Sequence, residues 1–119
     1  MIDLNKVKNI YLYTNQVDMR MGIYKIEILL SLSFSPIEIL DAVFVFVSKN
    51  RKQVKIYYED IYGKWLLINK LSYTKVIAPN LQSAKTITKR DLELLLQGVA
   101  MIEERKKLTT LSLTKPKQF

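Results

Sequence analysis

The sequence predicts an α+β domain, in which a mostly antiparallel β-sheet of four to five strands carries two main helices packed on one face. Three features of the chain support this fold class. Short segments of alternating polarity are separated by polar turns, one amphipathic segment lies near the end, and apolar residues at helical spacing mark a second helix. We place this single domain at residues 1–102 and a basic, flexible tail at residues 103–119.

The first strand and the first helix follow each other closely in the sequence. Residues 7–13 alternate in polarity, which predicts a β-strand. Asp18 is placed to cap a helix that starts near Met19, because its carboxylate can accept hydrogen bonds from the amides of the first turn. Apolar residues continue at helical spacing until the segment 33–36, whose proline disfavours a helical residue before it.

The middle of the chain predicts a series of antiparallel strands. The segment 43–47 is apolar on both faces, which is typical of a central strand. In the next strand, alternation places Tyr58 in the core and Tyr57 on the outer face beside Lys55. Gly63 suits the following hairpin turn, because glycine adopts positive φ without a steric penalty. The expected order is a strand at 43–47, a basic turn at 48–52, a strand at 53–59, a hairpin turn at 60–63, a strand at 64–71 and a short strand at 76–78.

A helix at residues 88–98 is the clearest helical signal. Thr88 and Asp91 form a pattern like a capping box, in which each side chain accepts a hydrogen bond from the backbone amide of the other residue. Leucine recurs along one face of this segment, and Gly98 is suited to end the helix with positive φ. Beyond residue 102 the chain becomes basic and polar, which predicts the tail.

Cysteine and histidine are absent from the 119 residues. Their absence excludes zinc sites built on Cys or His, cysteine nucleophiles and histidine general bases. The sequence has no Walker loop and no dinucleotide-binding fingerprint, so we expect neither a cofactor nor a bound metal. Residues 1–8 lack a signal-peptide pattern and the most apolar run, residues 42–47, is too short to span a bilayer, so we expect a cytoplasmic protein.

The net charge of +8 is distributed unevenly along the chain. Residues 1–45 carry four bases and five acids, so the remainder of the chain carries all of the excess positive charge. A basic surface attracts the phosphate backbone of nucleic acids, because binding releases condensed counterions. The alternative is a soluble basic protein whose charge serves no partner.

Two groups of bases are the candidate nucleic-acid contacts. Basic side chains on a turn between two strands can lie along a phosphate backbone, and aromatic residues nearby can stack on unpaired bases. The start of a helix also binds phosphate through its amides. A solvated turn and a solvated helix end are the alternatives. The candidates are Lys49, Arg51, Lys52 and Lys55 on the turn, and Lys89 and Arg90 at the helix start.

Three blocks of the sequence, in a fixed order, form a pattern beyond ordinary strand and helix signals. A short apolar strand opens the first block, and two strands joined by a basic turn run through the second. A leucine-rich helix that ends in glycine makes the third. The motif residues of the first two blocks are Asp18, Met19, Arg20, Gly22, Asp60, Gly63 and Trp65.

This ordered set resembles the small accessory protein of IS66-type insertion sequences over about residues 7–102. The chain departs from that family at four positions, where Glu59, Ile61, Ser72 and Ala78 replace its usual Trp, Gly, Glu and Trp. The resemblance implies a bacterial protein that is encoded beside a large transposase and a smaller DNA-binding partner. It also implies a role in supporting transposition.

We therefore expect a non-catalytic accessory protein that supports transposition by binding the DNA of the insertion-sequence ends, the large transposase, or both. The alternative is a protein-interaction or regulatory module that does not bind DNA directly. A third hypothesis is a metal-dependent nuclease, which needs carboxylates that hold two metal ions. Asp18, Asp60 and Asp91 are the aspartates that would have to converge, and each also has a local turn or capping role.

Overall fold

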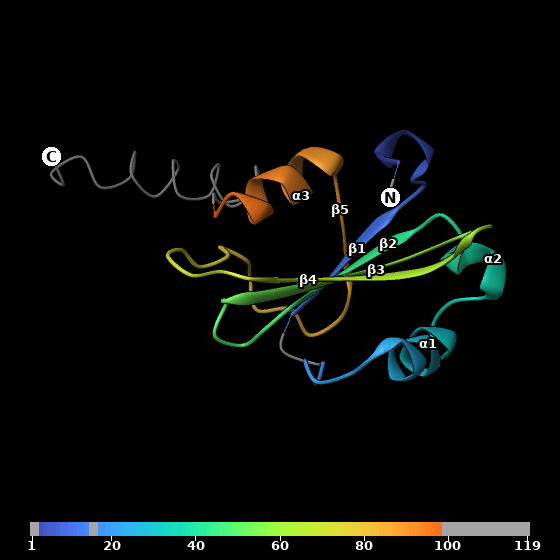
Figure 1. Ribbon diagram of the computed structural model, residues 1–119, viewed down its shortest axis with the longest axis horizontal. Helices are drawn as coiled ribbons and strands as arrows, with labels where there is room; N and C mark the ends of the chain where they lie inside the picture. The colour runs from blue at the N-terminus through green and yellow to red at the C-terminus, as the bar shows by residue number, and fades with distance from the viewer. Residues whose placement is uncertain (1–2, 15–16, 99–119) are drawn as a thin grey trace, which may run out of the picture.

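A five-stranded β-sheet with helices on both of its faces forms the protein (Figure 1). The computed structural model describes residues 3–14 and 17–98, and it confirms the α+β class with a mostly antiparallel sheet. The strands lie in the order β4-β3-β2-β1-β5. Their bounds are β1 (Ile10–Thr14), β2 (Val43–Val47), β3 (Gln53–Asp60), β4 (Gly63–Lys70) and β5 (Lys85–Ile87). The helices are a short 3-10 turn η1 (Leu4–Lys6), α1 (Ile23–Ser31), α2 (Pro36–Ile39) and α3 (Lys89–Leu96).

The centre of the sheet is a parallel pair of strands, β1 and β2, in which Ile10 lies beside Val43 and Thr14 beside Val47. Parallel neighbours cannot be joined by a tight hairpin, so they need a crossover connection. The connection between β1 and β2 carries α1 and α2 (Figure 1). Every other pairing is antiparallel, namely β5 with β1, β3 with β2 and β4 with β3.

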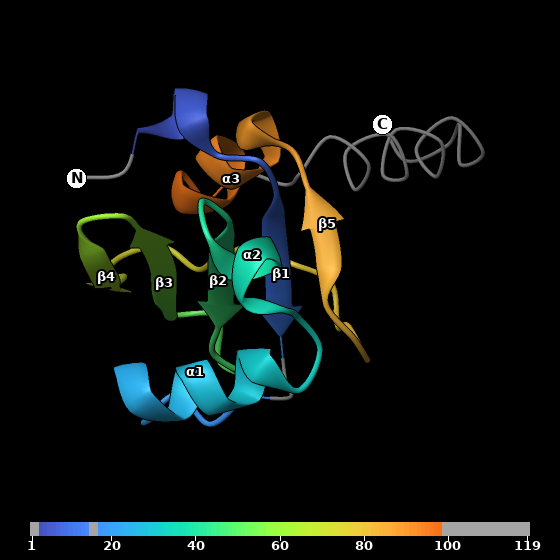
Figure 2. The same ribbon diagram turned by 90° about the vertical axis from the view of Figure 1, so that its right-hand side faces the viewer.

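Both faces of the central strands are buried, and each face has its own core. Phe44 belongs to the apolar cluster that contains Leu30 of α1, whereas Val45 belongs to the cluster that contains Leu95 of α3. Figure 2 shows α1 and α3 on opposite sides of the sheet. The expectation that the two main helices pack on one face is therefore wrong. A central strand that is apolar on both sides needs cover on both, and β2 is buried throughout.

Tyr57 lies on a covered face of the sheet and not on the outer surface that alternation predicted. Its side chain is fully buried in the cluster that includes α1, and its ring centroid is 6.4 Å from that of Phe44. The hydroxyl donates a hydrogen bond of 3.2 Å to Glu59, and burial raises the pKa of the Tyr57 phenol. Alternation correctly separated the two faces of β3. The prediction failed because α1 covers the face that was expected to be exposed.

Helix α1 begins at Ile23 with Gly22 as its N-cap, and not near Met19 as predicted. Asp18 does not cap the helix, because its carboxylate accepts hydrogen bonds from the backbone amide and the guanidinium of Arg20. This local pair closes a turn that precedes the helix. The predicted cap at Asp18 is therefore wrong.

The hairpin and the last helix confirm three local predictions. Gly63 pairs with Asp60 at the end of the β3–β4 hairpin and has φ +148°. Thr88 and Asp91 form a complete capping box at the start of α3. Gly98 directly follows the C-cap of α3 with φ +73°. Each of these features depends on residues only a few positions apart, which is why the sequence pattern was sufficient.

The region between β4 and α3 differs from the prediction. Residues 76–78 form no strand, and Val76 is instead buried with its amide donating to the carbonyl of Arg51. The fifth strand, β5, is three residues long and pairs with β1 at one edge of the sheet. Three residues are too few to show an alternating pattern, so the sequence does not predict β5. The predicted domain boundary at residue 102 and the tail at 103–119 lie outside the described residues.

Neighbouring leucines test which side of α1 and which side of α3 is buried. Leu30 and Leu95 are fully buried, whereas Leu32 and Leu96 are 79% and 37% exposed. Leu30→Ala and Leu95→Ala should each lower the free energy of unfolding by about 2–5 kcal/mol, because each leaves a cavity. Leu32→Ala and Leu96→Ala should change it by less than about 1 kcal/mol. Urea denaturation measures the free energy of unfolding of all four variants. An equal loss for Leu30→Ala and Leu32→Ala, or for Leu95→Ala and Leu96→Ala, would contradict this packing.

Candidate nucleic-acid interface

The basic turn between β2 and β3 is held by its own polar side chains. Ser48 Oγ donates to Asn50 Oδ1 at 2.8 Å and accepts from the amide of Gln53 at 2.9 Å. Asn50 Oδ1 also accepts from the amide of Lys52 at 3.0 Å. Arg51 has φ +63°, a left-handed conformation that is uncommon for a residue other than glycine. The turn therefore keeps a strained residue within a fixed hydrogen-bond network.

Arg51 uses its guanidinium to fix this turn to the loop that precedes β5. The group donates to the carbonyl oxygens of Ala78 at 3.3 Å and Pro79 at 3.2 Å, and to Asn80 Oδ1 at 2.7 Å. It also donates to the carbonyl of Ser48 within the turn at 3.1 Å. The planar guanidinium, with five N–H donors, suits such a set of acceptors. The sequence predicted Arg51 as a DNA contact, but the structure places its charged group in bonds within the protein.

Lys55 is a second base that the fold uses internally. Its side chain is buried, with 7% of the residue exposed, and Nζ donates to the carbonyl of Met21 at 3.0 Å. This bond ties the segment before α1 to the middle of β3. A phosphate group outside the protein cannot reach the Lys55 ammonium unless that contact opens. The predicted group of four turn bases therefore divides into two structural bases and two exposed ones.

A hollow of about 550 Å³ lies between the two segments that Arg51 and Lys55 hold in place. Lys49, Lys52 and Lys70 line it, and all three are exposed. Among the described residues, no carboxylate lines this hollow. Three like charges without a lining acid produce a positive potential that favours an anion. We call this feature, lined by these three lysines, the lysine hollow.

Lys70 is the lining base that the sequence prediction missed. It lies opposite Gln53 in the β3–β4 ladder, so the two side chains share one face of the sheet. The signal for it was present in the predicted hairpin. Pairing Asp60 with Gly63 and following the register back along both strands places Lys70 opposite Gln53, beside the basic turn.

Lys89 and Arg90 lie at the other end of the sheet. Ile87, which precedes them, pairs with Ile10 where β1 begins, whereas the lysine hollow lies at the end where β2 stops. Both bases are exposed, and Arg90 forms an ion pair of 3.1 Å with Glu93. The structure therefore does not bring the two predicted groups of bases together.

The first motif block lies beside the lysine hollow. Met19 lines the hollow, and Gly22 is the N-cap of α1. Asp18 and Arg20 form an exposed ion pair, with 2.9 Å between Asp18 Oδ2 and Arg20 Nη2. The side-chain hydrogen bonds from Arg20, followed by its backbone hydrogen bond, lower the pKa of Asp18 to about 2. This block shapes the entry to α1.

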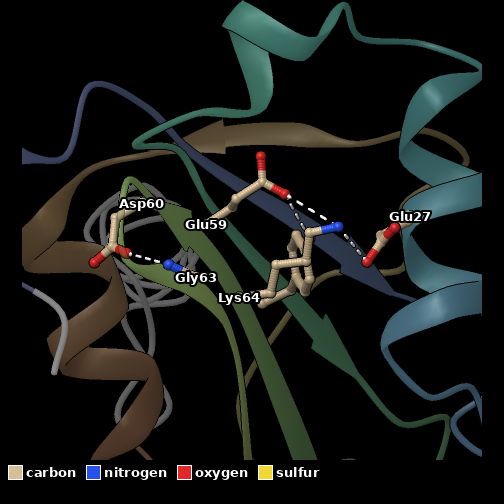
Figure 3. A network of polar contacts seen from close by, with 6 residues as sticks. Glu27, Glu59, Asp60, Gly63 and Lys64 are labelled. Carbon is tan, nitrogen blue, oxygen red and sulfur yellow. Dashed lines mark hydrogen bonds and ion pairs between the residues drawn. The ribbon is translucent and has the colours of Figure 1, made fainter.

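The motif residues of the second block lie at the opposite end of the sheet, at the β3–β4 hairpin (Figure 3). Asp60 Oδ1 accepts a hydrogen bond of 3.0 Å from the amide of Gly63 and thereby closes the turn. Lys64 Nζ lies 2.8 Å from Glu27 Oε1, an ion pair that ties α1 to the hairpin. Trp65 stands on the edge strand β4 and is 41% exposed. The bond between Asp60 and Gly63 gives these two motif residues a structural role in the turn.

The three aspartates of the nuclease hypothesis do not converge. Asp18 precedes α1, Asp60 lies in the hairpin turn and Asp91 belongs to the capping box of α3. The part of the chain that the structure describes contains no group of three or more acidic, Cys or His residues that could hold a metal ion. None of the helices within residues 3–14 and 17–98 has the length and the apolar character that a membrane span requires.

Comparison with protein families gives a match over most of the chain. A family model described as IS66 Orf2 like protein matches residues 8–106. The match includes all three blocks of the sequence pattern and confirms the resemblance that they carry. No curated protein and no solved structure matches the chain.

Two adjacent turn bases separate the structural role from the exposed one. Arg51→Gln should lower the free energy of unfolding by roughly 1–3 kcal/mol, because the bonds to the loop before β5 are lost. Lys52→Gln removes the same charge from an exposed side chain and should change stability by no more than about 0.5 kcal/mol. Thermal and urea denaturation compare the two, and equal stabilities would contradict the structural role of Arg51.

The Asp18–Arg20 pair gives a titration that can be followed by NMR. The carboxyl of Asp18 should titrate with a pKa of about 2 instead of the ordinary 3.8. Its contribution to stability is then fully present above the ordinary pKa and is lost as the pH falls through about 2. Arg20→Gln should return the pKa of Asp18 toward its ordinary value, whereas Lys25→Gln, the control, should leave it nearly unchanged. An ordinary pKa for Asp18 in the unaltered protein would refute the pair.

Proposed function

Because this chain belongs to the IS66 Orf2 like protein family, which is associated with transposition, we propose that it is an accessory protein that supports transposition of an insertion sequence. In this role the lysine hollow holds the phosphate backbone of the element's DNA, and the protein itself catalyses no step. Its partners are the DNA of the insertion-sequence ends, the large transposase and the small DNA-binding protein of the same element.

The single observation that supports the DNA contact is the convergence of Lys49, Lys52 and Lys70 on one hollow. Two come from the turn between β2 and β3 and the third from the end of β4, so the fold assembles them from separate segments. Exposed ammonium groups bind phosphates as flexible point charges and release counterions. Phosphate contacts position a protein on DNA without reading sequence. We therefore expect this hollow to hold DNA of any sequence.

A second candidate function has support from the outer face of α1. Tyr24, Ile28 and Leu32 recur at four-residue spacing along it and are 75%, 48% and 79% exposed. The opposite face of the helix is buried through Ile26 and Leu30. The helix therefore presents apolar side chains on an exposed face as well as on its buried face, and an exposed apolar patch is typical of an interaction site. A protein-interaction module, with the large transposase as the partner, would use this face.

The DNA contact is tested by fluorescence anisotropy with a labelled duplex that carries the terminal repeat of an IS66-type element, and with a scrambled duplex. The protein should bind both with similar affinity, and binding should weaken steeply as salt increases. The triple variant Lys49→Gln, Lys52→Gln and Lys70→Gln should reduce the slope of log K against log salt by about 2–3 units, because each phosphate contact contributes about 0.9.

The matched control removes three charges from the other end of the molecule, as Lys6→Gln, Lys89→Gln and Arg90→Gln. It should change the salt slope by less than about 1 unit. An equal effect of the control would show that the lysine hollow is not the contact. Absence of binding to either duplex at low salt would refute the contact with duplex DNA and favour the apolar face of α1 as the functional surface.

A further inference from the structure

We propose that the lysine hollow holds an unpaired nucleotide of a DNA strand, with the base against an apolar floor and the neighbouring phosphates on the lysines. This inference rests on the proposed function, since it assumes that this end of the protein holds DNA, and it specifies which form of DNA fits. We call the three apolar residues that line the hollow beside the lysines, Val17, Met19 and Leu71, its apolar floor; all three are partly buried.

An apolar floor distinguishes an unpaired base from a duplex. A phosphate group stays hydrated and gains little from apolar neighbours, so three lysines on a polar surface would suffice for a duplex backbone. The flat face of a base in a duplex is stacked between its neighbours and is not available to the protein. An unpaired base exposes that face, and its burial against methyl, methylene and thioether groups is favourable. The combination of Met19 and Leu71 with lysines therefore fits a single strand better than a duplex.

The remaining lining groups match the edge of a base. Asn50 and Gln53 line the hollow. The side-chain oxygen of Asn50 already accepts two hydrogen bonds within the turn, so Asn50 offers its N–H donors to the polar edge of a base, whereas the side-chain amide of Gln53 can both donate and accept. Lys70 stands opposite Gln53 on the same face of the sheet, so an amide and an ammonium group lie together there. The apolar floor therefore matches the face of a base, the side-chain amides match its polar edge, and the lysines match the neighbouring phosphates.

The walls of the hollow are fixed before any ligand arrives. Arg51 holds the turn that carries Lys49 and Lys52, through its bonds to the loop before β5. Lys55 holds the segment that carries Met19, through its bond to the carbonyl of Met21. Fixed walls reduce the entropy that binding would otherwise cost. The two bases that sequence analysis assigned to DNA contact thus hold the nucleotide site in shape.

The test compares three ligands of equal length with the full chain, by fluorescence anisotropy at one low salt concentration. They are single-stranded oligothymidine, its duplex with oligoadenine, and an oligothymidine strand with abasic residues. We expect the single strand to bind about tenfold more tightly than the duplex, and the abasic strand to lose most of that advantage, as expected for a base buried on the protein. Met19→Ser with Leu71→Ser should remove the preference for the single strand while leaving duplex binding within about twofold.

Ile37→Ser is the control variant, because Ile37 is 73% exposed on α2 and does not line the hollow. It should retain the preference for the single strand. If the variant with Met19→Ser and Leu71→Ser unfolds, the abasic strand still tests whether a base is buried, because this ligand needs no change to the protein. Equal affinity for the single strand and the duplex, or for the intact and abasic strands, would overturn the nucleotide site while leaving the proposed function intact. Absence of binding to all three ligands would overturn the DNA contact of the proposed function as well.

Discussion

The parallel pairing of β1 with β2 is the constraint on which the rest of the structure depends. Parallel neighbours require a crossover, so α1 and α2 lie in their connection, and α3 covers the face of the sheet that α1 leaves open. The same connection places residues 17–21 near the end of the sheet where β2 turns into β3. The lysine hollow forms where these segments meet, so it is a product of topology and not of one local motif.

The distance between interacting residues decides what the sequence could predict. The central strand at 43–47, the β3–β4 hairpin and the Thr88 capping box depend on neighbours within a few positions, and local patterns found them. The side on which α3 packs and the short strand β5 depend on remote partners, so no local pattern contains them. The candidate site follows the same rule. Arg51 and Lys55 donate to acceptors 27 to 34 residues away, so no local pattern could show that the fold uses these two predicted bases in bonds within the protein.

The basic residues of this protein therefore form two groups, one bonded within the protein and one exposed, and the sequence alone does not distinguish them. Arg51 and Lys55 satisfy backbone carbonyls and hold two segments in place, whereas Lys49, Lys52 and Lys70 keep their ammonium groups at the surface. Exposed ammonium groups on segments that are held in place suit a partner that presents phosphates, because phosphate contacts do not depend on the base sequence. Such contact fits the role proposed for this chain, in which an accessory protein holds DNA while another protein performs the chemistry.

The most direct measurement is an NMR titration of the isotope-labelled protein with short single-stranded DNA, followed through the amide chemical shifts. We expect the largest shifts at residues 17–19, 48–53 and 70–71, around the lysine hollow, and small shifts at Lys89 and Arg90. That result would show that DNA is held at the end of the sheet where β2 turns into β3. The largest shifts at Lys89 and Arg90, or shifts spread evenly over the surface, would contradict the assignment of the hollow as the DNA contact.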